Sequence, residues 1–211
     1  PYVFEETFTS APVDWEIQGG SWGMMNRWIC DPRWSWFGGH SRGVATVWNR
    51  RTFKGDVTVE IYAGFMMVRQ NRPTEHPTNL GLSICGNGKH LFSGYTFLIG
   101  GNENHLTSLF RKEVPVYETR DRKFLLPVDR GDRNSLDAAH KSWLHVKLNK
   151  RGERVTCWYQ GRKAFEYDDP HPLDLGQVAV WTVNNGILLG RVRIMAEEVA
   201  GRSIPFRDYS R

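Results

Sequence analysis

The chain has 211 residues, of which 24% are charged and 13% are aromatic, and its 28 Lys and Arg against 23 Asp and Glu give a formal net charge of +5. This composition excludes an intrinsically disordered chain, because disorder requires few aromatic residues and a larger charge imbalance. No run of about 18 apolar residues occurs, so we expect no membrane partner. The length suits one unit, and we expect a single domain over residues 1–211.

The basic residues are scattered singly or in pairs among acidic ones. Nucleic-acid binding requires a concentrated basic stripe, so we expect no nucleic-acid partner. The sequence begins at Pro1 without an initiator Met or a charged and then apolar leader. This favours either a mature secreted form or a module of a larger multidomain chain.

The cysteines are Cys30, Cys85 and Cys157. They allow at most one disulfide, and their spacing matches no zinc site, so we expect no metal ligands among them. Cys85 and Cys157 lie in strand-like segments where a small apolar side chain packs well. Buried free thiols are therefore the favoured interpretation.

The first distinctive segment is residues 28–40, which is rich in aromatic residues and interrupted by Pro and Gly. We expect a loop here. Trp34 and Trp36 alternate around Ser35, so both rings point the same way if the backbone is extended. Phe37 and His40 follow in the same segment.

The clearest strand covers residues 56–62. Val57, Val59 and Ile61 fall on one face, whereas Glu60 and Tyr62 fall on the other, as expected for a half-buried strand. The polar segment 68–78, which includes Arg69 and His76, follows as an expected loop, either a groove wall or simply solvated. Further strands with turn signals between them are expected at residues 44–48, 94–99, 144–148, 155–159, 177–181 and 188–194.

Only residues 135–141 have the composition of a short helical turn. Many short strands separated by turns predict an all-β fold in which antiparallel sheets form a sandwich or barrel. Trp143, at the start of the meander over residues 143–161, is expected to be a packing residue. Tyr95 points opposite to Gly94 and Thr96, and the pattern leaves open whether it faces a ligand or the core.

Several segments resemble the concanavalin A-like lectin/glucanase superfamily, a group of two-sheet antiparallel β-sandwiches with the jelly-roll topology. The chain is similar in particular to uncharacterised bacterial members near the 3-keto-disaccharide hydrolase family. The similarity is carried by residues 4–8, 20–23, 53–60, 143–161, 167–170, 176–181, 184–187 and 191–194.

The resemblance implies a carbohydrate ligand, bound in a groove on the concave sheet, and a secreted or periplasmic location. A saccharide groove needs exposed aromatic planes together with side chains that bond hydroxyls. The leading hypothesis is a carbohydrate-binding module or accessory domain. The candidate substrate-binding residues are Trp34, Trp36, Phe37, His40, Glu60, Tyr62 and Arg69. The alternative for the tryptophans is that their rings cover one end of the sandwich.

An enzyme, either a glycoside hydrolase or a polysaccharide lyase, is the second hypothesis, with Glu60, His76 or Tyr95 as acid or base. Retaining hydrolysis needs two carboxyls about 5 to 5.5 Å apart. The glucanase motif places carboxylates at alternate strand positions, and here Thr58 interrupts Asp56 and Glu60. The lyase strand motifs are not matched either.

A structural or protein-interaction domain is the third hypothesis. No cofactor is expected. A structural calcium ion is the one metal that the resemblance suggests, with Glu5, Glu6, Asp168 and Asp169 as the available acids. For Asp168 and Asp169 the simpler interpretation is a turn in which the carboxylates cap free backbone amides.

Overall fold

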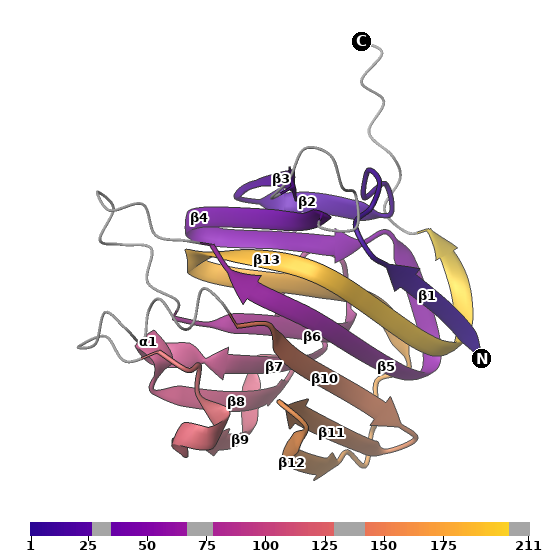
Figure 1. Ribbon diagram of the computed structural model, residues 1–211. Coiled ribbons are helices and arrows are strands. Elements are labelled where there is room, and N and C mark those ends of the chain that lie inside the picture. The colour runs from indigo at the N-terminus through magenta and orange to yellow at the C-terminus, as the bar shows by residue number, and fades with distance from the viewer. Residues whose placement is uncertain (27–34, 67–77, 129–141, 203–211) are drawn as a thin grey trace.

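The computed structural model describes residues 1–26, 35–66, 78–128 and 142–202, and β-strands dominate it (Figure 1). The strands pair antiparallel throughout the described residues. In chain order they are β1 (Tyr2–Glu6), β2 (Trp15–Gly19), β3 (Ser21–Asn26), β4 (Ser35–Asn49), β5 (Arg51–Phe65), β6 (Leu80–Gly86), β7 (Tyr95–Gly100), β8 (Leu106–Arg111), β9 (Val114–Thr119), β10 (Leu144–Arg151), β11 (Arg154–Tyr159), β12 (Arg162–Asp168) and β13 (Leu175–Arg202). Two short helical segments, α1 (Gly101–Asn104) and η2 (Arg122–Phe124), complete the described elements. Neither is long and apolar enough to span a membrane.

The strands form two layers. The first sheet has the order β12-β11-β10-β5 followed by the C-terminal part of β13, and β1, β3 and the N-terminal part of β4 extend it. The second sheet has the order β9-β8-β7-β6 followed by the N-terminal part of β13, the C-terminal part of β4 and β2. Figure 1 shows β10, β5 and β13 of the first sheet side by side.

Strands β4 and β13 belong to both sheets. They run antiparallel from the Trp48–Ala179 pair to the Phe37–Leu189 pair, and their register shifts just before Asn185. Before this shift β13 pairs with β6 between Gln177 and Trp181, and after it β13 pairs with β5 from Ile187 to Arg202. Its first two residues, Leu175 and Gly176, also pair with β5. The two strands therefore carry the hydrogen bonding from one sheet to the other, and the predicted jelly-roll β-sandwich is confirmed.

The hydrophobic core lies between the sheets. On β5, Val57, Val59 and Ile61 are buried in it, whereas Glu60 and Tyr62 point to the opposite, outer face. The predicted alternation is therefore correct. The core also includes Leu82, Phe97, Val146, Leu148, Val180 and Ile194 from neighbouring strands.

The outer face of the second sheet is covered by its own side chains. Trp48, Ala179 and Trp181 form a separate buried cluster there, on the opposite side of β13 from the core residue Val180. The Phe92 ring meets Trp181 edge to face with 5.5 Å between centroids. Aromatic packing therefore covers the part of this outer face around β13.

Three sequence expectations need correction. Residues 35–40 are not loop but the first part of β4. Residues 177–181 and 188–194 are not separate strands but parts of β13, and the expected turn at 184–186 is the site of the register shift. The expected loop at 68–78 and the helical turn at 135–141 lie almost wholly outside the described residues.

Cys85 and Cys157 are free thiols, as predicted, and Cys157 is fully buried. Burial raises the pKa of the Cys85 thiol to about 12. Thiolate chemistry at Cys85 is therefore suppressed near neutral pH. Cys30 lies outside the described residues.

Candidate functional site

The outer face of the first sheet presents two rows of side chains that cross β10, β5 and β13. The register of these strands sets side chains directly beside one another in each row. We call them the tyrosine row, which is His145, Tyr62 and Arg191, and the glutamate row, which is Lys147, Glu60 and Arg193.

The two rows enclose a cavity. Glu60, Tyr62, Arg191 and Arg193 line a hollow of about 160 Å³. The Tyr62 ring, 41% exposed, lies 4.9 Å from the His145 ring at a tilt of 33°. A planar, partly exposed ring therefore forms one wall, and charged groups form the others.

The charges at the cavity are only partly matched. The Nζ of Lys147 lies 3.2 Å from an Oε1 of Glu60. Arg191 donates from its guanidinium to Glu5 on β1. Arg193 forms no ion pair with the described acidic residues, and its buried Nε has no hydrogen-bond partner there. The same holds for the buried Nε2 of His145. A buried polar group without a partner is costly, and of these two side chains Arg193 is the one that lines the cavity.

An aromatic pair lies beside the tyrosine row, on the side away from the glutamate row. Trp36 of β4 meets Trp143 with 6.2 Å between ring centroids and an interplanar angle of 65°. The Trp143 ring lies over two glycines of the sheet, since a Cβ added at Gly64 would lie 3.6 Å from the ring and one at Gly190 would lie 2.9 Å from it. Trp143 is nevertheless 45% exposed. The interpretation of Trp143 as a packing residue is therefore incomplete, because much of its surface faces solvent.

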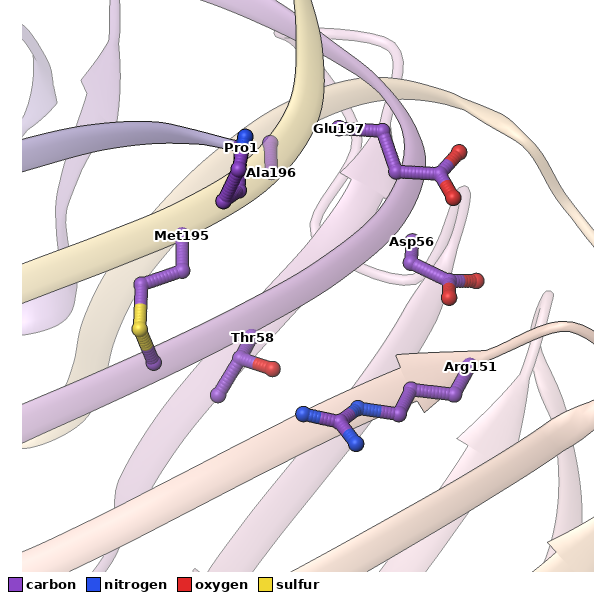
Figure 2. A pocket seen from close by; sticks show the side chains of 7 residues that line it. All are labelled: Pro1, Asp56, Thr58, Arg151, Met195, Ala196 and Glu197. Atoms are coloured by element: carbon purple, nitrogen blue, oxygen red, sulfur yellow. The ribbon is translucent and has the colours of Figure 1, made fainter.

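A second hollow extends the face in the other direction. It has a volume of about 200 Å³ and is lined by Pro1, Asp56, Thr58, Arg151, Met195, Ala196 and Glu197. Figure 2 shows Arg151 reaching toward Thr58, with the carboxylates of Asp56 and Glu197 to one side. From Gly64 to Asp56, strand β5 covers about 27 Å at the usual rise per residue. The face is thus long enough for an extended chain.

The predicted site residues have different outcomes. Trp36, Glu60 and Tyr62 lie on this outer face. His40 is exposed on β4, opposite Gly186 of β13. Trp34, Arg69 and His76 lie outside the described residues, so their roles stay predictions.

Phe37 is not a sugar-stacking residue. Its side chain is 3% exposed and belongs to the core, with ring centroids 5.6 Å from Phe8 and 5.0 Å from Trp22. Because side chains alternate along a strand, Trp36 and Phe37 necessarily point to opposite faces of β4. The loop interpretation concealed this difference.

Tyr95 faces the core and is fully buried, which argues against a role as acid or base. Its hydroxyl donates to Oδ2 of Asp169 at 2.6 Å and accepts from the backbone N–H of Leu173 at 3.0 Å. Arg111 donates from Nε to the same Asp169 oxygen. Burial and the hydrogen bond to Asp169 raise the pKa of Tyr95. Tyr95 is therefore part of a structural clamp that holds the chain after β12.

Strand β5 departs from the glucanase motif in the structure as it does in the sequence. Asp56, Thr58 and Glu60 share the outer side of β5. The middle position carries a hydroxyl, which donates to Asn149 Oδ1 at 2.5 Å. Glu60 forms an ion pair with Lys147, and the next position on the same side of β5 is Thr58 in place of a second carboxyl.

The acids proposed for calcium are used elsewhere. Glu5 bonds Arg191, Glu6 accepts from the backbone N–H of Phe8, and Asp168 bonds Arg154. Asp169 accepts from the backbone N–H of His171 at 3.0 Å, so it caps a backbone amide as expected. In the part of the chain that the structure describes, no three His, Cys, Asp or Glu side chains form a metal cluster. Calcium stays a prediction without an assigned site.

Fold and site together define the class, a two-sheet jelly-roll β-sandwich with an open outer face. No family model matches the sequence, and no curated protein matches it. Solved structures do match. The carbohydrate-binding module CBM66 from Bacillus subtilis is 16% identical, with a TM-score of 0.60 over 86% of this chain and 95% of that one.

Two other solved structures have the same fold. A Bacillus subtilis protein of unknown function with a galectin-like fold is 15% identical, with a TM-score of 0.58 over 94% of this chain and 96% of that one. A Bacillus licheniformis β-glucanase is 10% identical, with a TM-score of 0.55 over 92% and 98%. These identities establish a shared fold.

Proposed function

We propose that the chain is a carbohydrate-binding module or accessory domain that binds a poly- or oligosaccharide on the outer face of the first sheet. The observation that carries the proposal is the placement of an aromatic pair, the half-buried Trp36 and the exposed Trp143, in line with a polar cavity. Sugar rings have apolar faces bordered by hydroxyls, so they suit a surface that combines aromatic planes with charged hydrogen-bonding groups.

The residue roles follow from the arrangement. Trp36 and Trp143 stack on one sugar unit, and Tyr62 packs against the next. Glu60, Arg191 and Arg193 bond hydroxyls in the cavity. The name of the CBM66 structure supports this proposal, because it describes a carbohydrate-binding module with the same fold. A secreted or periplasmic location and nearness to the 3-keto-disaccharide hydrolase family belong to the same proposal.

The test is a glycan array with the purified chain, followed by calorimetry on the strongest hits. Trp143→Ala is expected to weaken binding by about 1 to 3 kcal/mol, the range for an aromatic hot spot. Leu175→Ala is the matched control, because Leu175 is an exposed apolar residue outside both rows. Unchanged affinity in Trp143→Ala removes the aromatic pair from the site.

A glycoside hydrolase is the second candidate, favoured by the outward carboxylate of Glu60 on the strand that corresponds to the motif strand of glucanases, although Thr58 replaces the middle carboxylate of that motif. Long incubation of the chain with each bound glycan tests it. Product formation that is lost in Glu60→Gln establishes the enzyme, whereas binding without product supports the binding module.

A further inference from the structure

The two arginines of β13 are the least balanced charges of the site. Arg191 and Arg193 are two residues apart on the outer face and both line the 160 Å³ cavity. Each described carboxylate nearby already has a cation, since Glu5 bonds Arg191 and Glu60 bonds Lys147. Arg193 is left with neither a carboxylate nor, at its Nε, any hydrogen-bond partner in the described residues.

The two strand neighbours of Arg193 are both carboxylates, and each pairs with another cation. Glu60 of β5 and Glu5 of β1 lie opposite Arg193 in the register, but Glu60 lies 3.2 Å from Lys147 and Glu5 bonds Arg191. Three cations therefore face two carboxylates around the cavity. Arg193 is partly buried, and its Nε is buried without a hydrogen-bond partner in the described residues, so a negatively charged ligand group would compensate its charge.

A neutral sugar can supply a hydrogen-bond acceptor to Arg193 but no negative charge. A hydroxyl accepts one hydrogen bond from the Nε of Arg193 but leaves the charge uncompensated. A carboxylate or a sulfate ester presents several oxygens to the planar guanidinium fork, and such charge-assisted hydrogen bonds are about twice as strong as neutral ones. The neighbouring Tyr62 ring can at the same time contact the apolar face of the sugar.

We propose that the site selects an acidic glycan, and that Arg193 binds the carboxylate or sulfate ester of a sugar unit whose ring lies against Tyr62. This inference rests on the proposed function, since it names the class of saccharide.

The experiment compares matched glycan pairs that differ in charge. The probes are polygalacturonate and its methyl ester, alginate and its propylene glycol ester, and dextran sulfate and dextran. The first two pairs test a carboxylate and the third tests a sulfate ester. In at least one pair the wild-type chain is expected to bind the acidic member about tenfold tighter or more at low salt, equivalent to one charge-assisted contact. The preference should shrink as salt is added.

The variants are Arg193→Gln, Arg193→Lys and the control Arg120→Gln. Arg120 is exposed just beyond β9 of the second sheet, so its replacement removes an equal charge from another surface. Arg193→Gln should lose the acidic preference, so that it binds the acidic and neutral members of each pair about equally. Circular dichroism and thermal unfolding check that the variant is folded. Arg193→Lys should retain part of the preference, because it keeps the charge without the planar fork.

Failure of this inference and failure of the proposed function give different experimental results. Equal binding of acidic and neutral members by the wild-type chain, or an unchanged preference in Arg193→Gln, overturns this inference and leaves the proposed function standing. No binding to any array glycan overturns the proposed function, and the inference with it.

Discussion

Glu60 lies between Lys147 and Arg193 on the outer face, and its carboxylate pairs with Lys147 at 3.2 Å. The pair is partly exposed, with 22% of the Glu60 side chain and 33% of the Lys147 side chain accessible. Such a pair contributes little to the free energy of unfolding, on the order of 0.5 kcal/mol. Its carboxylate nevertheless forms a wall of the cavity. The function of Glu60 is therefore separable from its effect on stability.

Glu60→Gln should lower glycan affinity about tenfold, because the amide replaces a charged acceptor of sugar hydroxyls. Calorimetry measures the affinity, and denaturant unfolding should show a nearly unchanged free energy. Lys147→Met is the matched control, since it breaks the same ion pair and keeps the carboxylate. If both variants lose affinity equally, the ion pair itself and not direct contact by Glu60 is responsible.

Trp36 and Trp143 should act as a unit. Their edge-to-face contact, 6.2 Å between centroids, fixes the orientation of both rings. Each single alanine variant should weaken glycan binding, and the double variant should weaken it by less than the sum of the two. The expected coupling free energy is about 0.5 to 1.5 kcal/mol, the range for aromatic pairs. Additive losses in the double-mutant cycle would show that the rings contact the ligand independently.

Phe37 and Trp36 should give opposite results although they are adjacent in sequence. Phe37→Ala should lower the free energy of unfolding by about 3 to 5 kcal/mol, because it leaves a cavity between Phe8 and Trp22. Its folded fraction should bind glycan normally. Trp36→Ala should show weaker binding with a smaller loss of stability. Denaturant unfolding and calorimetry on both variants measure the contrast. A glycan-binding defect in folded Phe37→Ala would show that Phe37 contributes to the binding site.

The sequence predicted the parts of this arrangement that depend on local alternation. The valines of β5 identify the core face, so Glu60 and Tyr62 could be assigned to the outer face. The same alternation with Val192 and Ile194 was a usable signal for Arg191 and Arg193, which the sequence interpretation did not use.

The remaining site residues depend on register between distant strands. Trp143 is recognisable as a surface ring only when Gly64 and Gly190 are known to lie beneath it. The glycines of residues 38–39 suggested a turn, although they lie inside β4, where Trp22 packs against Gly39. No local pattern contains either relationship, because each joins segments far apart in the chain.

Asp169 should make stability depend on pH. Burial by itself raises the pKa of this carboxyl, but the hydrogen bonds from Tyr95 and Arg111 outweigh burial and hold it below the ordinary 3.8. A carboxyl with a lowered pKa in the folded state stabilises the fold above its unfolded pKa, and this contribution is lost as pH falls through the folded value.

Asp169→Asn should therefore lower the free energy of unfolding by about 2 kcal/mol at pH 7, since the Asp169 carboxylate is buried but its partner Arg111 is one quarter exposed. The difference from wild type should shrink as pH falls from about 5 to about 2, because the wild-type carboxyl becomes protonated there. Urea unfolding across this pH range measures it. Asp168→Asn is the control, because its carboxylate bonds Arg154 at an exposed position and its loss should change stability much less. If the difference in free energy of unfolding between wild type and Asp169→Asn is the same at every pH, then packing, and not the charge of Asp169, stabilises the contacts of Tyr95.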